Sequence, residues 1–150
     1  MSFVPVDGEP LQRSCTVVRL AKPTSDGAVA LPIHFELSSE DKASKLKSIS
    51  VWEESLTPAP LARTLMNDTE NAYTLGLSLS VDAIKDLSVV IEEHPARQVI
   101  SLDVVWDLDC RAGAEGHAGI TGLHRQPGHP KLQYKMMRSK LAAIARPFCL

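Results

Sequence analysis

The sequence has few cysteines, no long apolar run and no segment typical of a secretion signal. Its cysteines, Cys15, Cys110 and Cys149, are odd in number and form no Cys-x-x-Cys pair, which argues against a disulfide framework. No uninterrupted apolar stretch approaches the roughly 20 residues needed to cross a bilayer. The start, MSFVPVDGEPLQRS, lacks the basic and apolar regions of a signal peptide. We therefore expect a soluble, cytoplasmic protein with reduced thiols and no membrane partner.

Also missing are the short motifs that mark common catalytic and nucleotide-binding sites. The chain has no Gly-x-Ser-x-Gly elbow, no P-loop, no Gly-x-Gly-x-x-Gly turn and no His-Glu-x-x-His helix. Each of these motifs positions a nucleophile, a phosphate or a metal by a fixed local geometry. Their absence removes the sequence support for the corresponding enzymes, and we expect no bound cofactor.

The length and composition are those of an ordinary globular domain. A chain of 150 residues with 44% hydrophobic and 23% charged residues can bury one core. Strand-like and helix-like segments do not alternate regularly, so a parallel βαβ arrangement is not predicted. We expect a single α+β domain over residues 1–150, a largely antiparallel sheet with two or three helices packed on it. Residues 1–14 are interpreted as an irregular arm.

Hydrophobic periodicity and turn residues predict the individual elements. Strands are predicted at 14–21, 28–37, 46–54, 72–79, 98–109 and 117–123. Helices are predicted at 57–68, capped by Thr57, and at 80–87, capped by Ser80, with one further turn in 38–45 capped by Ser38 or Ser39. The C-terminal helix is expected over about 130–146, because Pro130 suits a first helical position and Pro147 ends a helix.

The stretch EGHAGITGLHRQPGHPKLQYK, residues 115–135, contains three histidines and four glycines. Together with the preceding cysteine it offers four zinc donors, Cys110, His117, His124 and His129. Their intervals of seven, seven and five residues do not form the paired clamps of structural zinc sites. We interpret these four as surface or core residues and expect no metal. The nearby glycines are interpreted as turns and points of close backbone approach.

An enzymatic alternative uses the same stretch. His117 is a candidate general base, Asp107 or Asp109 could orient its imidazole, and Cys110 is a candidate nucleophile. Such pairs work because an adjacent base favours the reactive thiolate. These residues fall at the end of one predicted strand and the start of the next, so they could lie close together. The alternative is a small hydrolase-like enzyme, metal-dependent or of Cys–His type, centred on Cys110 and His117.

Charge is distributed unevenly along the chain. All 18 acidic residues lie at or before Glu115, and six of the 16 basic residues follow it. On the C-terminal helix, Lys131, Lys135 and Arg138 share one ridge at i, i+4 and i+7. The opposite side carries the apolar residues Leu132, Met136, Met137, Leu141 and Ile144, which are expected to dock on the sheet.

Three roles of this basic ridge are open: packing against the acidic body, a solvated face, or binding of another protein with an acidic surface. Nucleic acid is disfavoured, because net charge is −2 and Tyr134 is the aromatic residue at hand for stacking on bases. A homodimer formed through exposed sheet edges is a further alternative.

The segment EGHAGITGL, followed by an amphipathic helix ending in RSKLAAIA, resembles a loose set of short bacterial proteins without assigned function. These share a C-terminal His-Ala-x-Ile/Val-x-Gly motif, a polar gap and a helix with Leu-Ala near its end. The resemblance covers about residues 117–145 and implies an accessory protein; it carries over no catalytic residue. Together with the split charge, it favours a non-enzymatic accessory, adaptor or immunity-type protein that binds another protein through Lys131, Lys135 and Arg138.

Overall fold

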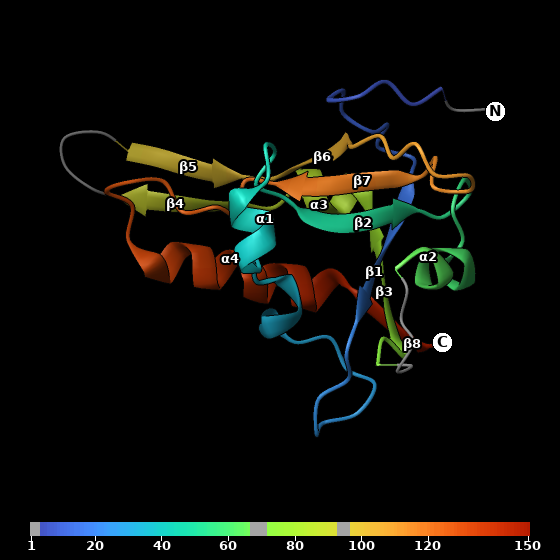
Figure 1. Cartoon of the computed structure of the whole chain (residues 1–150). Helices are drawn as coiled ribbons and strands as arrows, with labels where there is room; N and C mark the ends of the chain where they lie inside the picture. The colour runs from blue at the N-terminus through green and yellow to red at the C-terminus, as the bar shows by residue number, and fades with distance from the viewer. Residues whose placement is uncertain (1–3, 67–71, 93–96) are drawn as a thin grey trace.

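The computed structural model describes residues 4–66, 72–92 and 97–150. A six-stranded sheet in the order β6-β7-β2-β1-β3-β8 and a two-stranded sheet of β4 and β5 are both antiparallel throughout. The expected α+β class, the largely antiparallel sheet and the C-terminal helix are thus confirmed. Figure 1 shows α4 running along one side of the sheet, below it in this view, and α2 at the right-hand end of the molecule.

The strands are β1 (Thr16–Ala21), β2 (Ile49–Glu53), β3 (Leu75–Ser80), β4 (Ser88–Glu92), β5 (Arg97–Ser101), β6 (Asp103–Trp106), β7 (His117–Thr121) and β8 (Arg146–Cys149). The helices are α1 (Ser39–Ala43), α2 (Ala59–Leu65), α3 (Val81–Lys85) and α4 (Lys131–Ile144), with a 3-10 helix, η1 (Pro32–Phe35). The described residues therefore hold four α-helices where two or three were expected, and only α4 is longer than seven residues.

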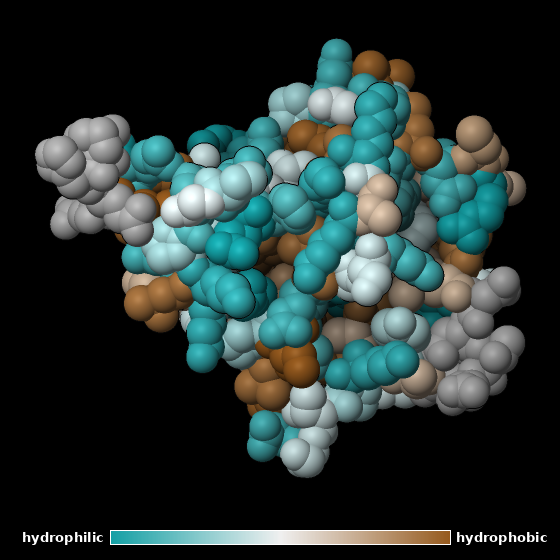
Figure 2. All heavy atoms as spheres, turned by 60° about the vertical axis from the view of Figure 1, so that its left-hand side comes forward, coloured by the Kyte–Doolittle hydropathy of each residue, from teal (hydrophilic) through white to brown (hydrophobic). Residues whose placement is uncertain are grey.

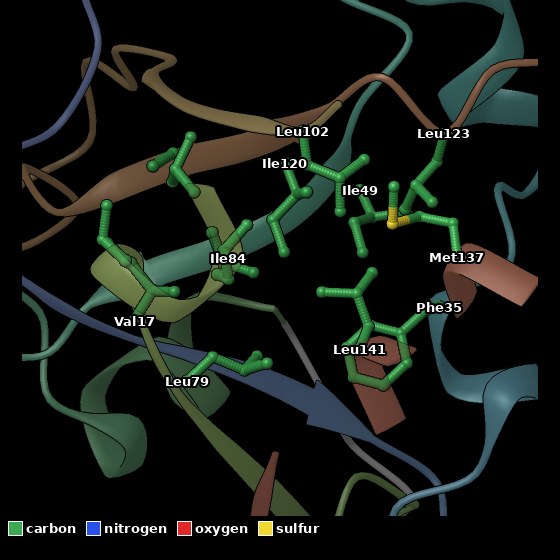
Figure 3. Packing of buried hydrophobic residues seen from close by; sticks show 14 of the residues in the cluster. Val17, Phe35, Ile49, Leu79, Ile84, Leu102, Ile120, Leu123, Met137 and Leu141 are labelled. Carbon is green, nitrogen blue, oxygen red and sulfur yellow. The ribbon is translucent and has the colours of Figure 1, made fainter. Parts of the chain in front are cut away.

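The main core lies on the side of the sheet that α4, α3 and η1 cover. Alternate residues of the central strands point into it, including Val17 and Leu79, which pair across β1 and β3. Met137 and Leu141 of α4 meet Phe35 of η1 there (Figure 3). All five side chains are at most 1% exposed, so the docking of α4 rests on apolar burial.

A second, smaller apolar cluster lies on the opposite side of the sheet. Val18 and Leu20 of β1 and Trp52 of β2 pack there against Ala59 and Ala62 of α2. Because successive strand residues point to opposite sides, β1 contributes to both clusters. The two tryptophans are both buried, Trp52 in this cluster and Trp106 in the main one.

Four parts of the described structure differ from the sequence-based expectation. Residues 28–37 form no strand; they hold η1, in which Pro32 starts the helix and Phe35 is buried. The predicted strand 98–109 is divided at Leu102 into β5 and β6, which belong to different sheets. The strands β4 and β8 were not predicted, and β8 begins at Arg146, the residue at which the C-terminal helix was expected to end.

Both edges of the main sheet are built from segments near the two ends of the described chain. Residues 8–11 of the arm bond to β6: the Gly8 N–H donates to the Trp106 carbonyl and the Leu11 N–H to the Val104 carbonyl, both at 2.8 Å. At the other edge β8 is exposed throughout and contains Pro147. Among the described helices none has the length and apolar character to cross a membrane.

Candidate functional site

A groove of about 420 Å³ runs between the start of α4, α1 and the loop that joins β7 to α4. Four basic side chains line it, and we call it the cationic groove: Lys42, Arg125, Lys131 and Arg138. The other lining residues are Glu36, Leu37, Leu123, His124 and Tyr134. Figure 2, which brings the left-hand side of Figure 1 forward, shows a face with mostly hydrophilic side chains and scattered hydrophobic ones.

The geometry of α4 brings Lys131 and Arg138 into the groove. They lie seven residues apart, two turns along one face of the helix, as the sequence predicted. Lys135 is exposed one turn from Lys131 but does not line the groove. Tyr134 lies between Lys131 and Arg138 in the sequence, lines the same groove and is buried. Two of the three residues predicted to bind a partner therefore lie in one hollow.

A chain of hydrogen bonds holds the loop between β7 and α4 in place. The Gln126 N–H donates to the Tyr134 hydroxyl at 3.2 Å, and that hydroxyl lies 2.7 Å from His129 Nδ1. His129 Nε2 contacts Gln98 Oε1 of β5. An amide oxygen only accepts, so Nε2 carries the proton and Nδ1 accepts the tyrosine hydrogen. This network fixes the loop that supplies His124 and Arg125 to the groove.

The basic side chains of the groove form no ion pair with a carboxylate of the described chain, although Glu36 lines the same groove. In residues 4–66, 72–92 and 97–150, none of Lys42, Arg125, Lys131, Lys135 or Arg138 makes an ion pair with a carboxylate. Lys131 is also the first residue of α4, whose first turn contains no acidic side chain. The positive end of the helix dipole adds to its charge. Among the described residues, therefore, the basic ridge forms no ion pair with the acidic part of the chain.

The apolar side of α4 also differs from the helical-wheel expectation. Met137 and Leu141 are fully buried, but Leu132 is 61% exposed and Met136 43% exposed. Tyr134 is buried in their place. The stripe of α4 that faces the core is therefore narrower than the apolar residues of the sequence indicate.

His117 lies in a second polar cluster, on the outer side of the sheet. Its Nδ1 is 2.8 Å from the Asp107 carbonyl oxygen and 3.5 Å from the Asp107 carboxylate, and its Nε2 is 3.2 Å from Ser50 Oγ. A carbonyl only accepts, so Nδ1 carries the proton and Nε2 is free to accept the serine hydrogen. Trp52 contacts the ring edge-on at a centroid distance of 4.7 Å.

The structure brings Asp107 and His117 together as the enzymatic alternative expected, but Ser50 occupies the position expected for Cys110. Cys110 is exposed, between Asp109 and Arg111, and is not among the contacts of His117. Ser50 reaches His117 because β2 and β7 pair with Trp52 opposite His117, which places Ser50 diagonally across the ladder. Ser50 and His117 are 67 positions apart in the sequence, and their contact depends on the register of β2 against β7. No local motif could have indicated it.

The four candidate zinc donors do not gather into one site. His117 contacts Asp107 and Ser50, His129 contacts Tyr134 and Gln98, and His124 lines the cationic groove. Within the part of the chain that the structure describes, no three His, Cys, Asp or Glu side chains lie close enough to hold a metal ion. Of the residues that the sequence singled out, those in the cationic groove and in the Ser50–His117–Asp107 cluster are the ones that lie in candidate sites of the described structure.

Comparisons with protein-family models, with curated proteins and with solved structures each find no match to this chain.

Proposed function

We propose that this protein is a binding protein and that its cationic groove holds an acidic segment of another protein. One observation carries the proposal: four basic side chains converge on one groove without a carboxylate partner in the described chain. Like charges that lie close together repel, so their convergence lowers the stability of the free protein. An acidic ligand relieves that repulsion and gains charge-assisted hydrogen bonds.

The shape and lining of the groove support an extended peptide over a point ligand. Its cations come from three separate segments: Lys42 from α1, Arg125 from the loop, and Lys131 and Arg138 from α4. Tyr134 and Leu123 line the same hollow and offer apolar contact between the charges. A segment that alternates carboxylates with small apolar residues matches this pattern. An accessory, adaptor or immunity-type role for the protein accords with such binding.

The proposal is tested by measuring binding of a fluorescent acidic peptide, rich in Asp and Glu, by anisotropy. The double variant Lys131→Glu, Arg138→Glu is expected to weaken binding at least about tenfold, because each substitution removes a charge-assisted contact and adds repulsion. Raising the salt concentration is expected to weaken the parent complex as well, since the groove is open to solvent.

A matched control separates the groove from net charge. The double variant Lys140→Glu, Arg146→Glu changes net charge equally at two exposed positions outside the groove lining. It is expected to bind the peptide almost as the parent protein does. Equal losses in the two double variants would contradict a defined groove. Tighter binding of a single-stranded oligonucleotide than of the peptide would assign the groove to nucleic acid instead.

A second candidate function, hydrolysis by an activated serine, is favoured by one observation: the Ser50–His117–Asp107 contacts. His117 in the tautomer that its contacts select can accept the proton of Ser50 Oγ as that oxygen attacks a carbonyl carbon. Asp107 orients the imidazole through its backbone oxygen, and its carboxylate is near enough to stabilise the imidazolium.

A fluorophosphonate probe tests this second function, because it labels activated serines covalently. Labelling at Ser50, located by mass spectrometry and lost in His117→Gln, would support it. Ser55→Ala is the matched control, since Ser55 lies on the same segment and its hydroxyl bonds to Glu53. Absence of label on the folded protein would contradict the hydrolase candidate and would leave the binding proposal untouched.

A further inference from the structure

Arg19 occupies the gap where β1 and β2 separate. The two strands pair only at Val17 with Glu53 and Val18 with Trp52, and beyond Val18 the ladder between them stops. The Arg19 side chain extends into this gap, where Nη1 donates to the Ser50 carbonyl at 2.9 Å and Nε to the His34 carbonyl at 3.2 Å. The Arg19 side chain therefore links β1 to β2 at a point where their backbones no longer hydrogen-bond to each other.

The two carbonyls satisfy hydrogen-bond donors of Arg19 but do not neutralise its charge. No carboxylate of the described chain forms an ion pair with it. Burial lowers the pKa of the guanidinium, and Asp41 and Tyr73 oppose that change only through space. Arginine still remains charged at neutral pH. A partly buried charge that no carboxylate contacts directly is costly, and an anion that reaches it is correspondingly favoured.

A pocket of about 330 Å³ opens beside this arginine. Its walls are mainly apolar, with Leu20, Ala21, Pro23 and Ile33, while Arg19 and Lys22 supply positive charge. The Lys22 ammonium lies 5.2 Å from the centroid of the Tyr73 ring, which also lines the pocket. Small-molecule sites are typically hollows of about 300–1,000 Å³ with mostly apolar walls and a few polar groups that fix orientation.

His34 holds the wall of this pocket in place. Its Nδ1 accepts from the Leu31 N–H and its Nε2 lies against the Lys22 carbonyl, both at 3.0 Å. The imidazole thus ties the segment before η1 to the end of β1, and it is buried. The pocket is therefore formed before any ligand enters, which lowers the entropy cost of binding.

We propose that this pocket binds a small organic carboxylate, with the Arg19 guanidinium holding the carboxylate and the apolar wall holding its hydrocarbon body. The guanidinium fork matches the geometry of a carboxylate better than a point cation does. Lys22 lies at the same pocket and adds attraction for the anion. The site is separate from the cationic groove and shares no lining residue with it.

The test compares phenylacetate with its neutral analogue phenylacetamide, using calorimetry and backbone amide shifts of the full chain. Phenylacetate is expected to bind saturably at millimolar concentration or below and to shift residues 19–24 and 33–34. It is expected to bind at least about tenfold more tightly than the amide, the effect of one charge-assisted hydrogen-bonded pair. Hexanoate extends the comparison to an aliphatic acid, and inorganic phosphate to an anion without a hydrocarbon body.

Variants decide whether the pocket is responsible. Arg19→Gln is expected to abolish the preference for the acid over the amide. Because Arg19 also bridges two carbonyls, Ile33→Trp provides a second variant that leaves the arginine in place and fills the pocket. Ile33 is 58% exposed, so this change does not disturb the core. Leu132→Trp, at an equally exposed position of α4, is its matched control and should leave binding unchanged.

Several results would overturn the proposal. Equal affinity for phenylacetate and phenylacetamide would show that Arg19 does not recognise the carboxylate. Phosphate binding as tightly as either acid would show that the apolar wall does not contribute to binding the hydrocarbon body. Failure of both acids to saturate, or unchanged binding in Ile33→Trp, would exclude this pocket as a carboxylate site. Loss of binding in Lys131→Glu, Arg138→Glu would move the acid to the cationic groove.

Discussion

The aromatic ring of Phe148 in β8 lies directly over Gly76 in β3, its partner across the ladder. A methyl group at position 76 would overlap the ring. The ring thus covers the strip of backbone that the glycine leaves bare, a pairing known to compensate for glycine in strands. The attachment of the edge strand β8 therefore depends on a residue without a side chain in β3.

Gly76→Ala is expected to lower the free energy of unfolding by about 1–3 kcal/mol, because the Phe148 ring must move from its site. Urea unfolding measures the change. Ser78→Ala, at the next outward position of β3, is the matched control and should have little effect. The double variant Gly76→Ala, Phe148→Ala should lose less than the sum of the two single changes. A Gly76→Ala protein as stable as the parent would contradict the overlap.

Gln133→Met in α4 is expected to raise the stability of the protein. The Gln133 Oε1 atom is buried and has no hydrogen-bond partner in the described structure. A buried acceptor left unpaired costs about 1–3 kcal/mol, and methionine has a similar length without that acceptor. Thermal unfolding should show a higher Tm, whereas Lys140→Met, at an exposed position of the same helix, should not. A lower Tm in Gln133→Met would count against this assignment.

Cys15 is expected to resist alkylation while Cys110 and Cys149 react. Burial raises the pKa of the Cys15 thiol, and the nearby Glu53 carboxylate raises it further. At a pH below that pKa a raised value means less thiolate, the reactive form. Iodoacetamide at neutral pH should modify the two exposed cysteines first, as read by mass spectrometry. Denaturant should make all three equal; comparable rates in the folded protein would disprove the burial of Cys15.

Arg111→Gln is expected to raise the pKa of Asp109 from about 2 toward its ordinary value. Hydrogen bonds from the Arg111 guanidinium to the carboxylate are the main cause of the low pKa. Because the folded-state pKa lies below the unfolded one, the pair stabilises the fold above about pH 4. That contribution is lost as the pH falls toward 2. Carboxyl NMR titration of both proteins measures it, and an unchanged pKa would rule out Arg111 as the cause.

Local signals in the sequence predicted local structure well. Ser38 caps α1 by accepting from the Asp41 N–H, and Ser80 caps α3 by accepting from the Ala83 N–H, both as expected. The glycines of residues 113–128 also behave as expected: Gly113, Gly122 and Gly128 have positive φ, and Gly116 and Gly119 lie against neighbouring atoms. The helix caps and the positive-φ turns depend on a few adjacent residues, which is why the sequence alone was sufficient for them; the atoms that crowd Gly116 and Gly119 come from the distant segment 48–57.

Contacts between distant segments could not be predicted. Thr57, expected to cap α2, is buried instead, where its hydroxyl donates to the Gly113 carbonyl and accepts from the Gly116 N–H. Helical spacing predicted that Lys131 and Arg138 share a face. No pattern indicated that Lys42 and Arg125 would join them, because that depends on how α1 and the loop pack against α4. The Ser50–His117 contact likewise depends on strand pairing.

The order of the strands has a consequence for how the chain folds during synthesis. β1 is synthesised before the other strands of its sheet but lies between β2 and β3, so it cannot be paired along both edges before Ser80 is made. The second edge of β2 stays unpaired until β7 is made, and the second edge of β3 stays unpaired until β8 is made. Pairing at such long separations is slow, and it leaves strand edges open meanwhile. We therefore expect chaperones to be needed to shield the open strand edges of nascent chains until residues 146–149 have emerged.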